Sequence, residues 1–449
     1  MIDVKIGDCR EVLKTIPDKS VNCVVTSPPY YGLRDYGTAK WVGGNPECDH
    51  VANPKATKKM GNPEFNENRP SREETKTAGY YQDICPKCGA VRVDKQIGLE
   101  QTPEEYVNNL VEVFREVKRV LRDDGTLWLN LGDSYWGGKG QSGSGNPEEQ
   151  KARNEDGQSL NKAYHQIAGD KLTRPTDRKH QIIKPKDLIG IPWRVAFALQ
   201  ADGWYLRQDI IWQKNNPMPE SVRDRCTKAH EYVFLLSKSQ KYYYDNEAIK
   251  EECQQSTSSR YKYGFGGDKN KELRGEGIRV PMVGSREYSE KRNKRSVWQV
   301  NTKPYKGAHF ATFPNALIEP CILAGTSEHG VCSECGVPFE RVTEVIGQVK
   351  QKWGTTERPD CRPGNENGNG DKGIRTGMIN VKNTVGWEPS CTCNASIVHA
   401  TVLDPFGGSG TVGEVCIRYN RNAILIELNP EYEQLIRKRL SNVQSVLVM

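Results

Sequence analysis

The sequence contains no long hydrophobic run. No apolar stretch approaches the ~20 residues that a membrane-spanning helix requires, and the opening residues MIDVKIGDCR lack the basic and then apolar pattern of a secretory signal. We therefore expect a soluble, cytoplasmic protein with no membrane partner. In that compartment, the 14 cysteines of the chain indicate metal ligation rather than disulfide bonds.

A strong net charge is missing as well. The 64 Lys and Arg residues exceed the 57 Asp and Glu residues by a net charge of +7, which is weak evidence for a polyanionic partner. The excess is concentrated in residues 258–295, where eleven basic side chains are interleaved with aromatic ones. Because basic groups neutralise phosphates and aromatic rings stack on bases, residues 253–295 are a candidate DNA-recognition segment, and residues 212–232 are a second. A solvated surface loop is the alternative interpretation.

Apolar strands and amphipathic helices alternate in four parts of the chain. In the second of them, Thr102 offers an N-cap, Pro103 suits the first helical turn, and apolar residues recur at helical spacing up to Leu121. The four parts are residues 3–27, 101–134, 188–239 and 397–429. This alternation predicts an α/β fold with a doubly wound sheet.

A glycine-rich loop lies late in the chain. LDPFGGSGTVGE (403–414) follows an apolar strand and precedes a helix, and Gly408 and Gly410 begin a match to G-x-G-x-x-G. Glu427 ends the next strand, 17 residues beyond Gly410. Glycines let the backbone approach a nucleotide, and an acidic side chain accepts hydrogen bonds from ribose hydroxyls, so this unit predicts a nucleoside-cofactor site. A tight strand-to-helix turn without a ligand is the alternative.

The residues around this loop bear on the kind of cofactor. NAD would satisfy the same glycine pattern. Asp404 and Phe406, however, suit a cofactor with a cationic amino-acid end and an adenine, and the loop does not open the domain as an NAD motif does. We therefore expect S-adenosylmethionine, with NAD as the alternative.

A proline-rich turn follows the strand at residues 21–27, and its chemistry suits a methyl-donating cofactor. The lone pair of an exocyclic amine on a base is delocalised into the ring, which makes the nitrogen a poor nucleophile. Hydrogen bonds from the amine to the Ser27 side chain and the Pro28 carbonyl favour a pyramidal nitrogen, and Pro28 and Pro29 preorganise that carbonyl. Tyr30 can stack on a flipped base. A plain proline turn is the alternative.

The early TSPPY and the late DPFGGSGT together resemble the beta-class DNA amino-methyltransferases, which modify cytosine at N4 or adenine at N6. In that group the catalytic motif precedes the cofactor motif, as it does in this sequence. The resemblance implies a Rossmann-like sheet of seven strands with helices on both faces. It also implies methyl transfer from S-adenosylmethionine to a flipped base in double-stranded DNA. The Ser-Pro-Pro-Tyr form of the motif favours cytosine N4.

The resemblance also implies which residues form the site. Asp8 follows the first strand as the family's adenine-contacting residue does, and Phe310 lies in HFATFP (309–314), which resembles the segment that closes over the methionine end of the cofactor. The implied catalytic residues are Ser27, Pro28, Pro29 and Tyr30, and the implied cofactor-binding residues are Asp8, Phe310, Asp404, Phe406, Gly408, Gly410, Thr411 and Glu427. A restriction endonuclease partner and a homodimer are left open.

Two C-x-x-C turns, each followed by glycine, are typical of zinc knuckles. The expected ligand sets are Cys48, His50, Cys85 and Cys88 in one module and Cys332, Cys335, Cys391 and Cys393 in the other. Because four ligands close a structural zinc site, we expect zinc in both zinc-ribbon-like modules. Free thiols and redox chemistry are the alternatives.

The prediction is a site-specific DNA methyltransferase whose catalytic domain is interrupted by inserts. The catalytic parts are residues 1–45, 96–252 with a loop at 137–185, 296–325 and 397–449. The inserts are the metal modules at residues 46–95 and 326–396 and the basic segment at 253–295. Three alternatives stay open: methyl transfer to RNA or a protein amide, an NAD-dependent oxidoreductase, and a catalytically inactive zinc-ribbon protein that binds DNA.

Overall fold

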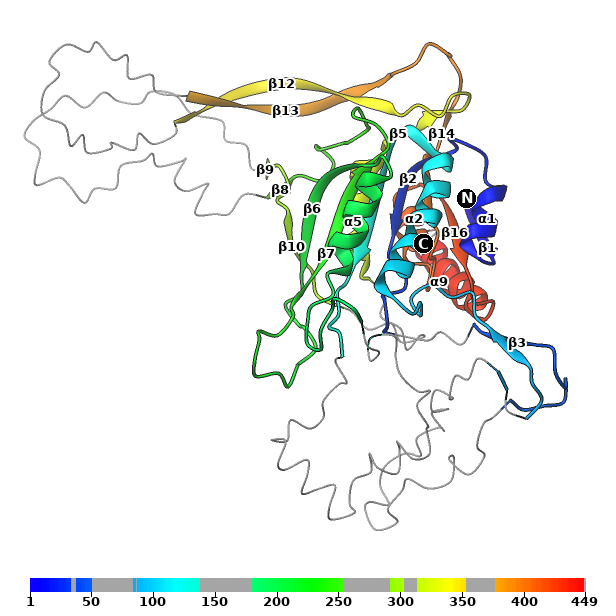
Figure 1. Ribbon diagram of the computed structural model, residues 1–449. Coiled ribbons are helices and arrows are strands. Elements are labelled where there is room, and N and C mark those ends of the chain that lie inside the picture. Colours follow the sequence, from blue (N-terminus) through cyan, green and yellow to red (C-terminus); the bar gives the residue numbers. More distant parts are fainter. Residues whose placement is uncertain are drawn as a thin grey trace, which may run out of the picture. The chain divides into compact units, whose positions relative to one another are not determined.

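The computed structural model divides the chain into two compact units. It describes residues 1–33, 38–50, 84–85, 87–137, 176, 180–252, 291–302, 313–352 and 376–447 (Figure 1). The first unit comprises Met1–Tyr243, Ser296–Gly325 and His399–Met449, and the second comprises Tyr244–Arg295 and Thr326–Val398. Phe310 and most of the basic segment at residues 253–295 lie outside the described residues.

In the described part of the first unit, a mixed sheet of eight strands forms the centre, in the order β1-β16-β15-β2-β5-β7-β6-β10. These strands are β1 (Ile2–Ile6), β2 (Val21–Thr26), β5 (Leu121–Leu131), β6 (Tyr205–Gln213), β7 (His230–Ser237), β10 (Val297–Gln299), β15 (Thr401–Asp404) and β16 (Asn422–Glu427). The strands from β1 to β5 in this order are parallel, β7 is antiparallel to both of its neighbours, and β10 is parallel to β6. The predicted α/β class is confirmed.

The predicted count of seven strands is wrong, because β10 adds an eighth strand beside β6. β10 has three residues, of which only Trp298 is buried. So short a segment shows no periodicity in the sequence, and it becomes a strand because the edge of β6 offers hydrogen-bond partners.

Helices cover both faces of this sheet (Figure 1). α1 (Cys9–Val12), α2 (Pro103–Val120) and α5 (Ile191–Ala201) lie on one face, and α7 (Asn315–Gly325), α8 (Thr411–Arg418) and α9 (Glu431–Leu447) lie on the other. α2 begins as predicted, since Thr102 Oγ1 accepts a hydrogen bond from the Glu105 amide at 3.2 Å. Among the described residues, we find no helix long and apolar enough to cross a bilayer.

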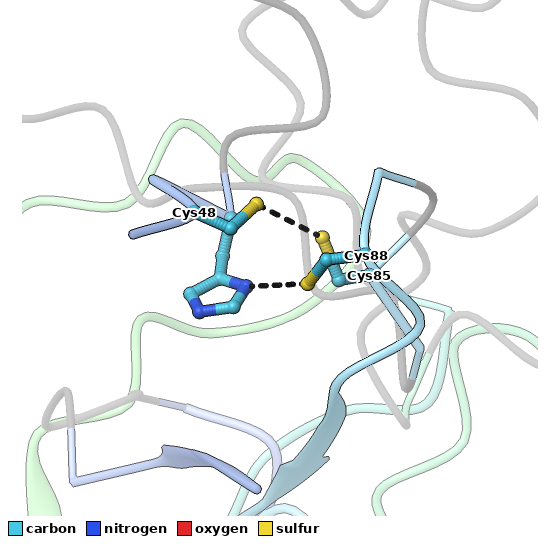
Figure 2. A group of neighbouring side chains, drawn as sticks. Cys48, Cys85 and Cys88 are labelled. Atoms are coloured by element: carbon cyan, nitrogen blue, oxygen red, sulfur yellow. Dashed lines mark hydrogen bonds between the residues drawn. The ribbon is translucent and has the colours of Figure 1, made fainter. Parts of the chain in front are cut away.

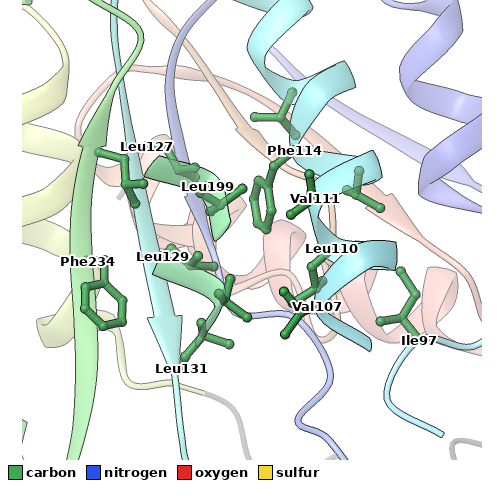
Figure 3. Close-up of a cluster of buried hydrophobic side chains, with 14 of the residues drawn as sticks. Ile97, Val107, Leu110, Val111, Phe114, Leu127, Leu129, Leu131, Leu199 and Phe234 are labelled. Atoms are coloured by element: carbon green, nitrogen blue, oxygen red, sulfur yellow. The ribbon is translucent and has the colours of Figure 1, made fainter. Parts of the chain in front are cut away.

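The hydrophobic core between α2, α5 and the sheet holds the first unit together (Figure 3). Leu110 and Phe114 of α2 are fully buried and lie in one cluster with Leu127, Leu129 and Phe234 of the sheet. Burial of each such side chain stabilises the fold by about 1.5–3 kcal/mol. The packing fixes the carboxyl ends of β2 and β5, and these ends carry the polar residues described below.

The second unit contains three strand pairs in its described part. β12 (Phe339–Lys352) and β13 (Thr376–Pro389) form a long antiparallel pair, β11 (Val331–Cys332) pairs with β14 (Ile397–Val398), and β8 (Glu251–Glu252) pairs with β9 (Lys291–Arg292). Arg341 of β12 forms an ion pair of 2.8 Å with the buried Asp245. Residues 326–396 were expected to form a metal module, and nothing in their sequence predicts the long β12–β13 pair.

Candidate functional site

The two predicted motifs meet at the carboxyl edge of the sheet, where β2 and β15 lie side by side. Thr26 Oγ1 donates a hydrogen bond of 2.7 Å to Asp404 Oδ1, and the Phe406 amide donates one of 3.1 Å to the same oxygen. Asp404 is 1% exposed, and this burial raises the pKa of its carboxyl to about 7. A bound cation would favour the ionised carboxylate at this position.

The glycine loop is held against the end of β16. The Gly408 amide donates to Glu427 Oε2 at 2.8 Å, and the Asn429 amide donates to Glu427 Oε1 at 2.8 Å. Gly410 has a φ of 78°, and a Cβ atom there would lie 2.9 Å from Ile436 Cγ2, so this position requires glycine. Burial raises the pKa of the Glu427 carboxyl to about 7.

Thr411 supports the glycine loop from behind. Arg439 of α9 donates hydrogen bonds to Ser409 Oγ at 2.7 Å and to Thr411 Oγ1 at 2.9 Å. It also forms an ion pair of 2.6 Å with Glu414, which accepts from Asn315 Nδ2. The Thr411 hydroxyl therefore accepts a hydrogen bond from within the protein.

Asp8 lies at the end of β1, the strand beside β16. The Gly7 amide donates to the Glu427 carbonyl at 2.8 Å, and Asp8 caps α1 by accepting from the Arg10 amide at 3.0 Å. Burial alone would raise the pKa of the Asp8 carboxyl, but the hydrogen bonds and charge of Arg10 lower it overall. Asp8, Glu427 and Asp404 thus lie at the ends of three adjacent strands and form an acidic edge there.

The turn at Ser27–Tyr30 is fixed by neighbouring hydroxyl groups. The Tyr106 hydroxyl donates to the Pro29 carbonyl at 2.8 Å. The Tyr30 hydroxyl lies 3.5 Å from Ser27 Oγ and donates to Glu231 Oε2 at 2.6 Å. Burial, followed by the charge of Glu231, raises the pKa of the Tyr30 phenol well above its ordinary value, so this hydroxyl remains a donor.

The sequence pattern predicted only that residues 212–232 could contact DNA, and it did not indicate that residues of this segment position Tyr30. Glu231 of β7 accepts from Tyr30 and forms an ion pair with Lys214 at the end of β6. Lys228 donates to the Asp133 carbonyl at 2.8 Å. These two lysines, which were candidates for the DNA cleft, are therefore engaged within the site. The sequence does contain a signal for Glu231, because this charged residue begins the otherwise apolar run EYVFLLS.

Gly132 lies beneath the Tyr30 ring, directly after β5. A Cβ atom at this glycine would lie 2.5 Å from Tyr30 Cε2 and 2.9 Å from Cδ2. Asn130, two residues earlier, places its Oδ1 atom 3.1 Å from the Tyr30 hydroxyl. Gly132 supports the ring, and Asn130 and Glu231 hold the hydroxyl, so Tyr30 presents a fixed aromatic surface.

The structure brings together both predicted metal-ligand sets. In each set, one ligand atom from every residue lies within 4.8 Å of the others. Figure 2 shows the first set, in which the Sγ atoms of Cys48 and Cys85 are 3.9 Å apart and Cys88 Sγ lies 3.5 Å from His50 Nδ1. In the second set, the hydrogen bond with Cys335 and burial raise the pKa of Cys393 to about 12. A divalent cation would remove the cost of ionising such crowded thiols.

This chain is similar in sequence to DNA methyltransferases over most of its length. Residues 21–333 and 393–438 match the family described as DNA methylase, which comprises N6 and N4 methyltransferases. The type II methyltransferase M.Cfr9I of Citrobacter freundii is 36% identical to this chain over 97% of its residues and 86% of the relative. M.SmaI of Serratia marcescens is 34% identical over 97% of this chain and 89% of the relative. The chain belongs to the N6/N4 DNA methylase family.

Two DNA methylases are among the solved structures that align with this chain. The PvuII DNA methyltransferase (cytosine-N4-specific) has 14% sequence identity and a TM-score of 0.43, covering 99% of this chain and 90% of that one. A putative DNA modification methylase of Thermus thermophilus, complexed with S-adenosyl-L-methionine, has 16% identity and a TM-score of 0.40, covering 99% and 96%.

Proposed function

We propose that this DNA methylase transfers a methyl group from S-adenosylmethionine to N4 of cytosine in duplex DNA. Adenine N6 is the second candidate. The observation that carries the proposal is the hydrogen bond between Thr26 and Asp404. It joins the turn that would hold the target amine to the start of the loop that would hold the methyl donor, as a direct transfer requires.

In the proposed reaction, S-adenosylmethionine supplies the methyl group. Ser27 Oγ and the Pro28 carbonyl accept hydrogen bonds from the amine and make its lone pair available, while Tyr30 stacks on the base. The nitrogen forms a bond to the methyl carbon as the carbon–sulfur bond breaks. The thioether product takes the electron pair, and the extra amine proton leaves to solvent.

The preference for cytosine rests on the residue at position 27. The resemblance associates serine there with N4 of cytosine and aspartate with N6 of adenine. Serine offers a neutral oxygen, which the Tyr30 hydroxyl approaches to 3.5 Å. The proposed cofactor contacts are Asp8 with the adenine, Glu427 with the ribose hydroxyls, and Asp404 with the cationic amino-acid end.

Mass spectrometry of nucleosides tests the proposal. Duplex DNA of varied sequence, incubated with the purified protein and S-adenosylmethionine, is expected to yield N4-methylcytosine. The double variant Ser27→Ala, Tyr30→Ala is expected to yield none. N6-methyladenine would reassign the base, and the absence of either product would contradict DNA methylation and turn attention to RNA and protein amides.

Binding of S-adenosylmethionine is expected to depend on pH. Burial raises the pKa of both Asp404 and Glu427 to about 7, so both carboxyls are largely protonated at pH 6 in the free protein. The cationic ligand favours their ionised forms, and binding therefore releases protons. Isothermal titration calorimetry should show an affinity about ten- to a hundredfold weaker at pH 6 than at pH 8, since each carboxyl that must ionise contributes up to about tenfold. Glu427→Gln should reduce this dependence, and a flat profile would contradict it.

A restriction endonuclease of the same specificity is the partner that we propose. The designation of the relatives as type II methyltransferases supports it. A genomic DNA substrate also fits the cytoplasmic location expected from the sequence.

Zinc is the second cofactor that we propose, with one ion in each cluster. The ligand types and the spacing within 4.8 Å support a closed four-ligand shell. Such a shell leaves no position for a reactive water, so both ions would be structural.

A further inference from the structure

The first metal cluster, formed by Cys48, His50, Cys85 and Cys88, belongs to an insert that runs from Gly32 to Gly98, and the two ends of this insert meet beside the turn at Ser27–Tyr30. We infer that metal bound at this cluster stiffens the turn and thereby sets the rate of methyl transfer. The inference rests on the proposed function of the turn. It assigns to this cluster a role in catalysis that the second cluster does not share.

The metal would add four bonds between the two halves of the insert, which an exposed ion pair of 2.7 Å between Lys87 and Asp49 also joins. Cys48 and His50 follow β3 (Lys40–Val42), whereas Cys85 and Cys88 precede β4 (Val91–Val93). β3 and β4 pair over only three residues, and so short a two-stranded sheet is marginal by itself. Four metal–ligand bonds between the halves would therefore decide whether the described part of the insert keeps one conformation.

The chain returns from the insert to the turn through residues 94–98. Asp94 Oδ1 accepts from Thr38 Oγ1 at 2.9 Å, which joins the two ends of the β3–β4 pair. The Gly98 carbonyl then accepts from the Gly32 amide at 2.8 Å. Gly32 lies two residues after Tyr30. This hydrogen bond therefore joins the point where the chain leaves the turn to the point where it returns.

Gly98 also packs directly on the turn. A Cβ atom at this residue would lie 3.2 Å from the Tyr30 carbonyl oxygen and 3.3 Å from Pro29 Cβ. A shift of residues 94–98 is therefore transmitted to Tyr30, which presents the stacking ring, and to Pro29, which directly follows the Pro28 carbonyl. Misplacement of reacting groups by about 1 Å can lower a rate about 100-fold.

The matched variants Cys88→Ser and Cys335→Ser test the inference, because each removes one thiolate from one cluster. The full-length wild type is expected to contain two zinc ions, and each variant is expected to contain one. In Cys88→Ser, amide hydrogen exchange at residues 27–33 should become faster and kcat should fall about tenfold or more. The affinity for S-adenosylmethionine should stay within about threefold in both variants, which also shows that the sheet is folded. Cys335→Ser should retain the wild-type exchange and kcat.

Removal of zinc from the wild type by a chelator, followed by addition of zinc alone, provides a second measurement without a substitution. Exchange at residues 27–33 should rise and then recover. Wild-type protein without zinc, unchanged exchange after zinc loss, or equal effects of the two variants would overturn the inference. Protein that binds two zinc ions and shows the exchange effect but methylates no DNA would contradict the proposed function alone.

Discussion

Replacement of Ser27 by alanine is expected to lower kcat by about 10²–10³-fold while the affinity for S-adenosylmethionine changes by less than about threefold. Only Ser27 and Tyr30 carry side-chain oxygens in the turn Ser27–Tyr30. The Tyr30 hydroxyl already donates a hydrogen bond to Glu231. Loss of Ser27 Oγ therefore leaves the target amine with one acceptor, the Pro28 carbonyl. The effect falls on the chemical step because the serine acts where the nitrogen changes geometry.

Single-turnover transfer of a labelled methyl group into duplex DNA measures this effect, and calorimetry measures the binding of S-adenosylmethionine. Ser20→Ala is the matched control, since Ser20 is exposed and precedes the other end of β2. An unchanged rate in Ser27→Ala would show that this oxygen does not hold the amine. An equal loss of cofactor binding would point to a folding defect.

Replacement of Gly132 by alanine is expected to lower kcat by about 10–100-fold, although the residue touches neither DNA nor cofactor in the proposed reaction. The added Cβ would lie 2.5 Å from the Tyr30 ring, so the ring must move. Its hydroxyl cannot move with it without breaking the 2.6 Å hydrogen bond to Glu231. The stacking surface is thus displaced, while the acidic edge that would bind the proposed cofactor is left intact.

Fluorescence of a 2-aminopurine base at the target position reports the stacking, alongside kcat. Gly386→Ala is the matched control, because a Cβ there has no atom within 4 Å. In the double variant Gly132→Ala, Tyr30→Ala, the glycine substitution should add little to the loss caused by Tyr30→Ala alone. Additive losses would show that Gly132 acts independently of the ring.

Contacts between residues close together in the sequence could be predicted, because local backbone geometry alone brings such residues together. The N-cap residue Thr102 accepts a hydrogen bond from the amide of Glu105, which lies only three residues further along the chain. The C-x-x-C pairs bring two thiols together in one turn, and each predicted set of four ligands is close enough for one ion. Ser27 and Asp404 both follow predicted strands, and the carboxyl ends of parallel strands meet at one edge of a sheet.

Residues that act from different strands were not predictable in this way. Glu231 heads an apolar strand that could have paired at several places, and its role follows from the position of β7 beside β5. Gly132 differs in no visible way from the other glycines of the chain until the Tyr30 ring lies over it. The strand β10 exists only because β6 offers it an edge.

The sequence by itself determined the α/β class, the order of the two motifs, the chemical groups of the site and the metal-ligand sets, since these depend on contiguous residues and on strand direction. The tertiary structure alone decided how those groups are held. The Thr26–Asp404 hydrogen bond, the Tyr30–Glu231 pair and the packing of Gly98 on Pro29 each join residues far apart in the chain. Such contacts depend on which strands lie side by side, and no local pattern in the sequence encodes that order.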